Sequence, residues 1–145
     1  MRTLGTSTCL VLPLLPLLGG CEPGAYVAWE KDFQQSVNIS CIEQSMRHVA
    51  PDVRRGSYVS DGNSSRGFPS GTVVTQFGYS DPTLIGYYNL EVATLPNGAT
   101  RYWHGWGKTG THVPDEERSK IIPLLNRVND AVARDCGLTF EGAPR

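Results

Sequence analysis

The stretch TVVTQFGYSDPTLIGYYNLEVATLPNGATRYWHGW, residues 72–106, decides the fold because it predicts three strands joined by two short turns. The expected strands are Thr72–Tyr79, Leu84–Thr94 and Ala99–Trp106, each containing β-branched and aromatic residues. Between the last two strands, Pro96-Asn97-Gly98 favours a turn, since proline sets the bend and Asn and Gly tolerate a positive φ. Connections this short join antiparallel neighbours, so the stretch predicts a β-meander.

Alternation of side chains along a strand assigns the residues of the meander to two faces. In the middle strand we expect the core face to carry Leu84, Tyr88, Leu90 and Val92. In the last strand, one side carries Thr100, Tyr102, His104 and Trp106, and the other carries Ala99, Arg101, Trp103 and Gly105. Both sides of that strand hold aromatic residues, so the sequence leaves open which side meets the core.

Outside the meander, periodic apolar residues predict one helix on each side. The first is expected from about Glu30 to Val49, where Pro51 ends it. The second is expected from about Asp115 or Ser119 to Asp135, followed by Gly137 as a C-cap. A short strand is expected over residues 54–60, and the residues of 61–71 favour an exposed, mobile loop.

These elements predict an α+β domain. We expect an antiparallel sheet of three to four strands, with the N-terminal and C-terminal helices packed on one face. The stripe of the second helix carries Cys136, and that of the first carries Cys41. A disulfide between these cysteines would join the two helices.

The beginning of the chain has the order of a cleavable secretory signal. Arg2 supplies a positive charge, an apolar stretch runs from Cys9 to Leu18, and small residues follow. The apolar stretch is about half the length of a membrane-spanning helix, which needs about 20 residues. We therefore expect a removed signal and no permanent span.

The run Leu18-Gly19-Gly20-Cys21 resembles the lipobox of bacterial lipoproteins. The resemblance implies cleavage between Gly20 and Cys21 and attachment of diacylglycerol to the Cys21 thiol, with fatty acids such as palmitate holding the chain to a bilayer. In enterobacterial lipoproteins an Asp after the cysteine favours the inner membrane. This chain has Glu22 there, so the outer membrane is favoured, with the domain facing the periplasm or the cell surface.

The lipoprotein hypothesis divides the chain into three parts. Residues 1–20 are the expected signal, residues 21–29 a lipidated tether, and residues 30–145 a single globular domain. It also accounts for the four cysteines, because Cys9 leaves with the signal and Cys21 carries lipid. Cys41 and Cys136 remain, and outside the inner membrane the environment permits structural disulfides. We therefore expect a Cys41–Cys136 bond.

The charge balance argues against a nucleic-acid partner. The chain has 13 Lys and Arg against 14 Asp and Glu, a formal net charge of −1. Nucleic-acid binding favours a clustered basic surface, which this composition does not indicate. No cofactor is expected, since Gly105-Trp106-Gly107-Lys108-Thr109 lacks the spacing of a phosphate-binding loop.

The densest aromatic cluster offers two interpretations. Tyr102, Trp103, His104 and Trp106 stand beside a glycine-rich segment and are candidates for contacting an envelope protein or a glycan. Alternating aromatics in a strand are also good sheet formers that pack within the protein. The favoured function is a membrane-anchored, non-catalytic binding or assembly module, a class that includes inhibitors and immunity proteins.

The alternative is a small cell-wall or glycan hydrolase that uses His104 or His112 with a carboxylate such as Asp115 or Glu116. The eight-residue separation of the two histidines matches no recognised metal spacing, and no nucleophile accompanies them. The sequence therefore assigns no catalytic or metal-binding residue.

Overall fold

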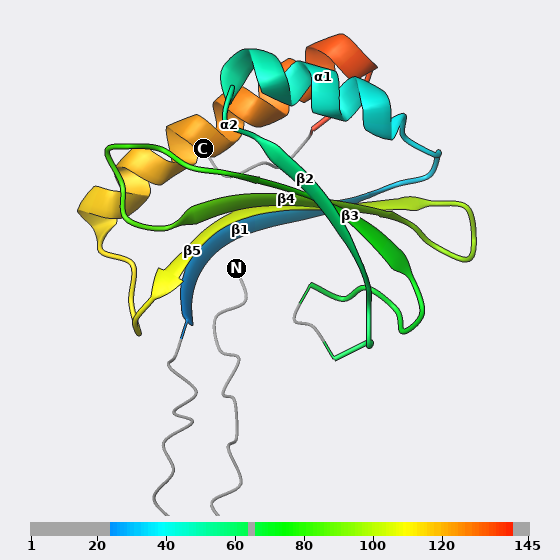
Figure 1. Cartoon of the computed structure of the whole chain (residues 1–145), viewed down its shortest axis with the longest axis horizontal. Coiled ribbons are helices and arrows are strands. Elements are labelled where there is room, and N and C mark those ends of the chain that lie inside the picture. Colours follow the sequence, from blue (N-terminus) through cyan, green and yellow to red (C-terminus); the bar gives the residue numbers. More distant parts are fainter. Residues whose placement is uncertain (1–23, 64–65, 141–145) are drawn as a thin grey trace, which may run out of the picture.

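The expected meander forms the centre of the fold. The computed structural model describes residues 24–63 and 66–140 (Figure 1). In it, β3 (Val73–Tyr79), β4 (Tyr87–Thr94) and β5 (Thr100–Thr109) pair antiparallel in chain order. The turn between β4 and β5 closes with Leu95 N–H donating to the Ala99 carbonyl at 2.7 Å. Gly98 has a φ of 83° in this turn, a conformation that favours glycine.

The sheet has five strands, so the expectation of three to four was too low. β2 (Arg54–Val59) pairs with β3 close to its predicted place. β1 (Gly24–Phe33) was not expected, and it pairs antiparallel with the whole of β5, from Gly24 opposite Thr109 to Phe33 opposite Thr100. The strand order is β1-β5-β4-β3-β2.

The first expected helix is wrong over nearly half of its length, residues 30–38. α1 spans Ile39–Val49. Residues 30–33, expected to be helical, are the end of β1, and residues 24–29, expected to be part of the tether, are its beginning. In β1 the buried side chains Val27, Trp29 and Phe33 follow the two-residue period of a strand. Asn38 marks the true start of α1, because its side-chain oxygen accepts a hydrogen bond from the Cys41 N–H at 3.2 Å.

The second expected helix is present as α2 (Asp115–Cys136). It begins at the earlier of the two expected starts, so Pro123 lies inside the helix and not in its first turn. Gly137 ends it in the left-handed conformation with φ 68°, as predicted for a C-cap. Neither helix in the described part of the chain is long and apolar enough to cross a membrane.

The main core lies between the helices and the sheet, and Figure 1 shows α1 and α2 side by side over the sheet. The helices contribute apolar residues that are fully buried: Ile42, Met46, Ile121, Leu125, Val128 and Val132. The sheet contributes a second set: Phe77, Tyr79, Tyr88, Leu90, Val92, Tyr102 and Trp106. The core face of β4 is therefore the predicted one.

The predicted disulfide is present. Cys41 of α1 and Cys136 of α2 are bonded, with their Cα atoms 5.9 Å apart and a sequence separation of 95. The bond joins two helices that β2 to β5 separate in the chain, and so fixes the layer that covers the sheet.

Removing this bond should lower stability substantially. In the chain-entropy model, closing a loop of about 100 residues contributes about 4.7 kcal/mol, an upper figure. We expect the free energy of unfolding of the domain from residue 22 onward to fall by about 3 to 4 kcal/mol on reduction. Urea unfolding with and without reductant measures this, and a Cys41→Ser, Cys136→Ser variant should match the reduced protein. Equal stability in both conditions would contradict the account.

Candidate functional site

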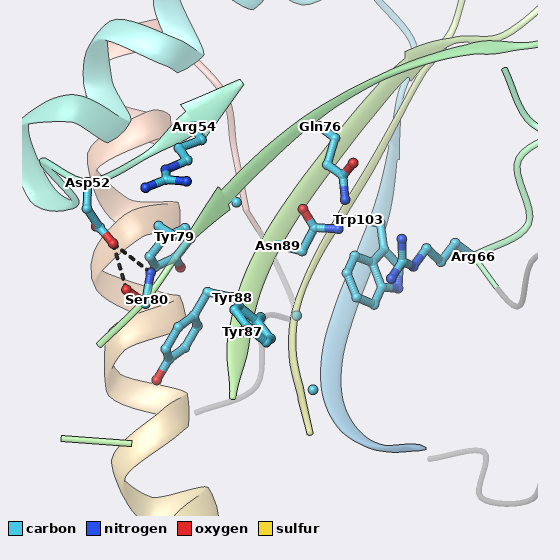
Figure 2. A pocket seen from close by; sticks show the side chains of 13 residues that line it. Asp52, Arg54, Arg66, Gln76, Tyr79, Ser80, Tyr87, Tyr88, Asn89 and Trp103 are labelled. Atoms are coloured by element: carbon cyan, nitrogen blue, oxygen red, sulfur yellow. Dashed lines mark hydrogen bonds between the residues drawn. The ribbon is translucent and has the colours of Figure 1, made fainter. Parts of the chain in front are cut away.

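A groove of about 620 Å³ opens mainly on the side of the sheet away from the helices (Figure 2). Its volume lies within the roughly 300–1,000 Å³ of small-ligand sites. The lining side chains come mainly from β3, β4 and β5, with Arg66 reaching in from the β2–β3 loop.

Glycines form much of the groove floor. In the strand register, Gly78 of β3 stands opposite Asn89 of β4, which stands opposite Gly105 of β5. A Cβ added to Gly78 would meet nothing within 4 Å, so this part of the floor is open. A Cβ on Gly105 would lie 2.7 Å from the Trp103 ring, so the absence of a side chain there lets the indole lie across the strand.

The walls combine aromatic, amide and charged groups. The Arg66 guanidinium stacks on the Trp103 ring, with its carbon 4.3 Å from a ring centroid. Figure 2 shows this pair at one side of the groove, Arg54 at the other, and the amides of Gln76 and Asn89 between them. A ligand would therefore meet flat apolar surface and planar hydrogen-bonding groups together.

Asp52 closes the side of the groove near Arg54. Its Oδ2 accepts from the Ser80 N–H at 3.0 Å and from the Ser80 hydroxyl at 2.7 Å. These hydrogen bonds lower the pKa of the Asp52 carboxyl from its ordinary value. The contact ties the end of β3 to the turn before β2 and keeps an ionised carboxylate at the rim.

A buried carboxylate lies under the wall made by Arg66. Glu91 of β4 is fully buried, and it accepts hydrogen bonds from Arg66, from the Asn89 amide and from the Tyr58 hydroxyl, the last at 2.9 Å. Beside this cluster, Phe68 is 1% exposed and packs with Val74, Ala93 and Trp103. The other described residues of the loop are exposed, as expected, apart from the half-buried Arg66, so Phe68 is the buried exception in this segment.

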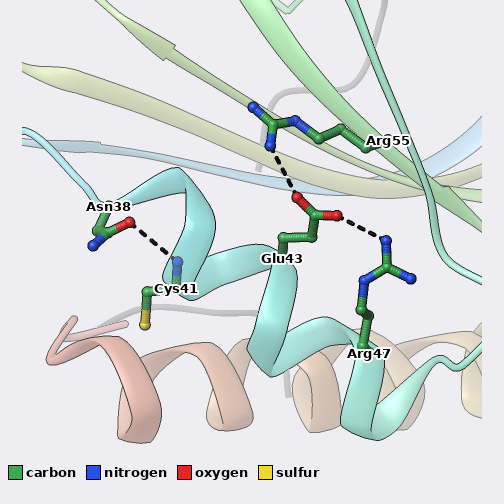
Figure 3. A network of polar contacts seen from close by, with 5 residues as sticks. All are labelled: Asn38, Cys41, Glu43, Arg47 and Arg55. Atoms are coloured by element: carbon green, nitrogen blue, oxygen red, sulfur yellow. Dashed lines mark hydrogen bonds and ion pairs between the residues drawn. The ribbon is translucent and has the colours of Figure 1, made fainter.

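The two arginines that open β2 point to opposite sides of the sheet. Arg54 lines the groove, whereas Arg55 faces α1 and donates to Glu43 at 2.9 Å (Figure 3). Arg47 donates to the same carboxylate at 2.8 Å, and these hydrogen bonds lower the pKa of Glu43. Only the first arginine is therefore placed to contact a ligand in the groove.

The structure divides the aromatic cluster expected at the site. Trp103 lines the groove, while Tyr102, His104 and Trp106 lie on the other side of β5, buried under the helices. The cause is strand alternation, which sends consecutive side chains to opposite faces. Tyr102, His104 and Trp106 therefore belong to the packing of the core.

His104 is the centre of a buried polar chain. Its Nδ1 lies 2.7 Å from the Asn129 side-chain oxygen, and its Nε2 lies 2.7 Å from the Tyr79 hydroxyl. The Tyr102 hydroxyl donates to the same Asn129 oxygen at 2.8 Å. Since that oxygen can only accept, we assign the neutral tautomer protonated at Nδ1, with Tyr79 donating to Nε2. Burial lowers the pKa of His104 to about 4.

The other candidates for hydrolytic chemistry are not assembled around His104. His112 lies exposed in the connection between β5 and α2, and Asp115 and Glu116 are exposed at the start of α2. Within residues 24–63 and 66–140, no three His, Cys, Asp or Glu side chains form a group suited to a metal ion. Cys21 lies outside the described residues.

The sequence did not predict that Arg66, Asn89 and Glu91 are neighbours in one site. Asn89 and Glu91 carried a signal, because they are polar residues at alternate positions of a strand whose other side is apolar. Arg66 carried none, since its approach to Trp103 depends on the path of the loop.

Comparison with protein-family models and with curated proteins finds no match for this chain.

Truncating Arg66 should destabilise the domain because it leaves a fully buried carboxylate without this arginine. We expect Arg66→Ala to lower the free energy of unfolding by about 3 kcal/mol, as measured by urea unfolding. Adding Glu91→Gln should recover part of that loss, since glutamine keeps an acceptor for Tyr58 and removes the charge. Additive losses in the double variant would show that the two side chains do not interact.

The buried His104 predicts a pH dependence of stability. The folded pKa of about 4 lies below the ordinary 6.5, so the unfolded chain takes up the proton first as pH falls. Stability from this residue is complete above about pH 6.5 and declines by about 3 kcal/mol down to about pH 4. Urea unfolding across this range should show a shallower decline in His104→Gln. The same decline in both proteins would rule out His104 as the cause.

Proposed function

We propose that this chain is a bacterial envelope lipoprotein, anchored by lipid on Cys21, whose groove binds a cell-wall glycan without cleaving it. The observation that carries the proposal is the groove itself, in which Trp103, Tyr87, Gln76 and Asn89 surround a glycine floor. The anchor rests on the lipobox resemblance.

The mixture of groups in the groove suits a sugar chain. A pyranose ring has apolar C–H surfaces that pack on aromatic rings, and hydroxyls that need donors and acceptors in fixed directions. The exposed Tyr87 ring offers the first kind of contact, and the amide of Gln76 offers the second. The Asn89 side chain adds a second amide to the groove lining.

A peptide is a poorer occupant of this groove. An extended peptide binds most strongly by adding its backbone to a free sheet edge. The groove lies over β3, β4 and β5, which are interior strands whose backbone groups already pair with neighbours on both sides. Recognition here must come from side chains, and that favours a ligand rich in hydroxyls.

The lining also favours binding over hydrolysis. Most glycosidases use a pair of carboxyl groups that flank the scissile bond. The groove residues in the described part of the chain include one carboxylate, Asp52, and Ser80 already engages it. Glu91 lies beneath Arg66, fully buried.

Binding is tested by isothermal titration calorimetry, in which the domain from residue 22 onward is titrated with soluble glycan strands from peptidoglycan. We expect Tyr87→Ala and Gln76→Ala each to weaken binding about tenfold, which corresponds to about 1.4 kcal/mol. These variants remove ring and amide contacts, and the 78% exposure of Tyr87 keeps its replacement from disturbing the core.

Val59→Ala is the matched control, because Val59 is also largely exposed, at 64%, but lies outside the groove. Its binding should equal that of the wild type. No binding by the wild type, or equal losses in all three variants, would overturn the proposal. Shortening of the glycan during incubation would favour the hydrolase alternative.

A further inference from the structure

Exposed apolar side chains gather at one end of the sheet. Tyr26 of β1 is 60% exposed, Ile85 in the β3–β4 connection is 90% exposed, and Tyr87 of β4 is 78% exposed. Both tyrosines stand opposite Gly107 of β5 in the strand register, Tyr26 on the neighbouring strand β1 and Tyr87 on the neighbouring strand β4. Ile85 and Tyr87 also line a shallow hollow together with Gly24. Scattered apolar residues are normal on a surface, but a cluster marks an interaction site.

The local structure presents Ile85 outward. The turn before it is fixed by the Asp81 side chain, which accepts from the Thr83 N–H at 2.7 Å, and by Leu84 N–H donating to the Asp81 carbonyl at 3.2 Å. Leu84 packs against the core, so its neighbour faces away. Gly86 follows with φ 142°, and a Cβ there would lie 2.6 Å from the Trp106 ring. Ile85 is thus held out by ordered structure.

The path of the chain places this end of the sheet next to the expected anchor. Gly24 begins β1 and stands opposite Thr109, the last residue of β5. Only two residues separate it from Cys21. Three Cα–Cα steps of about 3.8 Å each span at most about 11 Å. A lipid-bearing Cys21 would therefore hold Gly24, and the apolar side chains near it, close to the bilayer surface.

We propose that Tyr26 and Ile85 form a membrane-facing patch that enters the interface of the bilayer holding the acyl chains of Cys21, while the neighbouring Tyr87 remains at the end of the groove. The inference rests on the lipidated Cys21 of the proposed function. Tyrosine is enriched at membrane interfaces, where its ring meets apolar chains and its hydroxyl meets water and headgroups. Ile85 supplies the most exposed apolar group of the patch. The anchor then sets the orientation of the domain as well as its location.

This orientation makes a prediction about the opposite end of the sheet. Val73 is 63% exposed at the start of β3, six residues from Tyr79. Six residues of a strand span about 20 Å. Tyr79 stands opposite Tyr88, near the patch, so Val73 should lie well away from the membrane.

The test uses the processed, full-length protein in vesicles of phosphatidylethanolamine and phosphatidylglycerol, some carrying bromine on the upper part of the acyl chains. Two variants each add one tryptophan, Ile85→Trp in the patch and Val73→Trp as the matched control. Bromine should quench at least half of the added fluorescence in Ile85→Trp and almost none in Val73→Trp. Tyr26→Ser combined with Ile85→Trp should reduce the quenching.

Equal quenching of the two added tryptophans would overturn the patch, as would quenching unaffected by Tyr26→Ser. Intact mass of the same sample separates this failure from failure of the anchor. If no acyl mass is present on the mature protein, the anchor and the patch both fail; if it is present without differential quenching, only the patch fails. Glycan binding is measured independently, and neither Ile85 nor Tyr26 lines the groove.

Discussion

Strand alternation is the constraint on which this structure depends, because the two helices cover only one face of the sheet. Side chains on the covered face form the main core, and those on the other face line the groove or pack in a smaller cluster around Phe68. The effect is clearest in β5, where Tyr102 and Trp106 are core residues and Trp103, between them in sequence, lines the groove. The Cys41–Cys136 bond holds the covering layer together and so maintains the difference between the faces.

The open face is shaped by a second, smaller cluster. Phe68 covers apolar side chains there, and the charge of Arg66 compensates the buried Glu91. The same arginine stacks on Trp103, so the loop that covers the carboxylate also builds a wall of the groove. Stability and the proposed binding therefore depend on the same residues of this face. Variants of the loop must be judged by both properties.

Features set by local chemistry could be predicted from the sequence. The meander followed from turn residues such as Asn97-Gly98, and the disulfide followed from the lipobox and the cysteine count. β1 was missed because its partner in the sheet, β5, lies more than 60 residues away, and because Phe33 falls at helical spacing from Val37 and Cys41.

The site was harder to predict than the fold. Both sides of β5 carry aromatic residues, so its pattern could not show which side the helices cover. The groove also needs Arg66 to cross from a loop, and Asp52 to meet Ser80 from another part of the chain. Such contacts depend on tertiary packing that no local pattern encodes.

The central claim is that the open face of the sheet recognises a glycan. The most direct measurement is a two-dimensional ¹H–¹⁵N NMR titration of the domain with soluble peptidoglycan glycan strands. The account predicts shifts that concentrate on Gln76, Asn89, Gly105 and Gly107, with α1 and α2 unchanged. Shifts confined to the helices or to the edge of β2, or no shifts at saturating glycan, would contradict it.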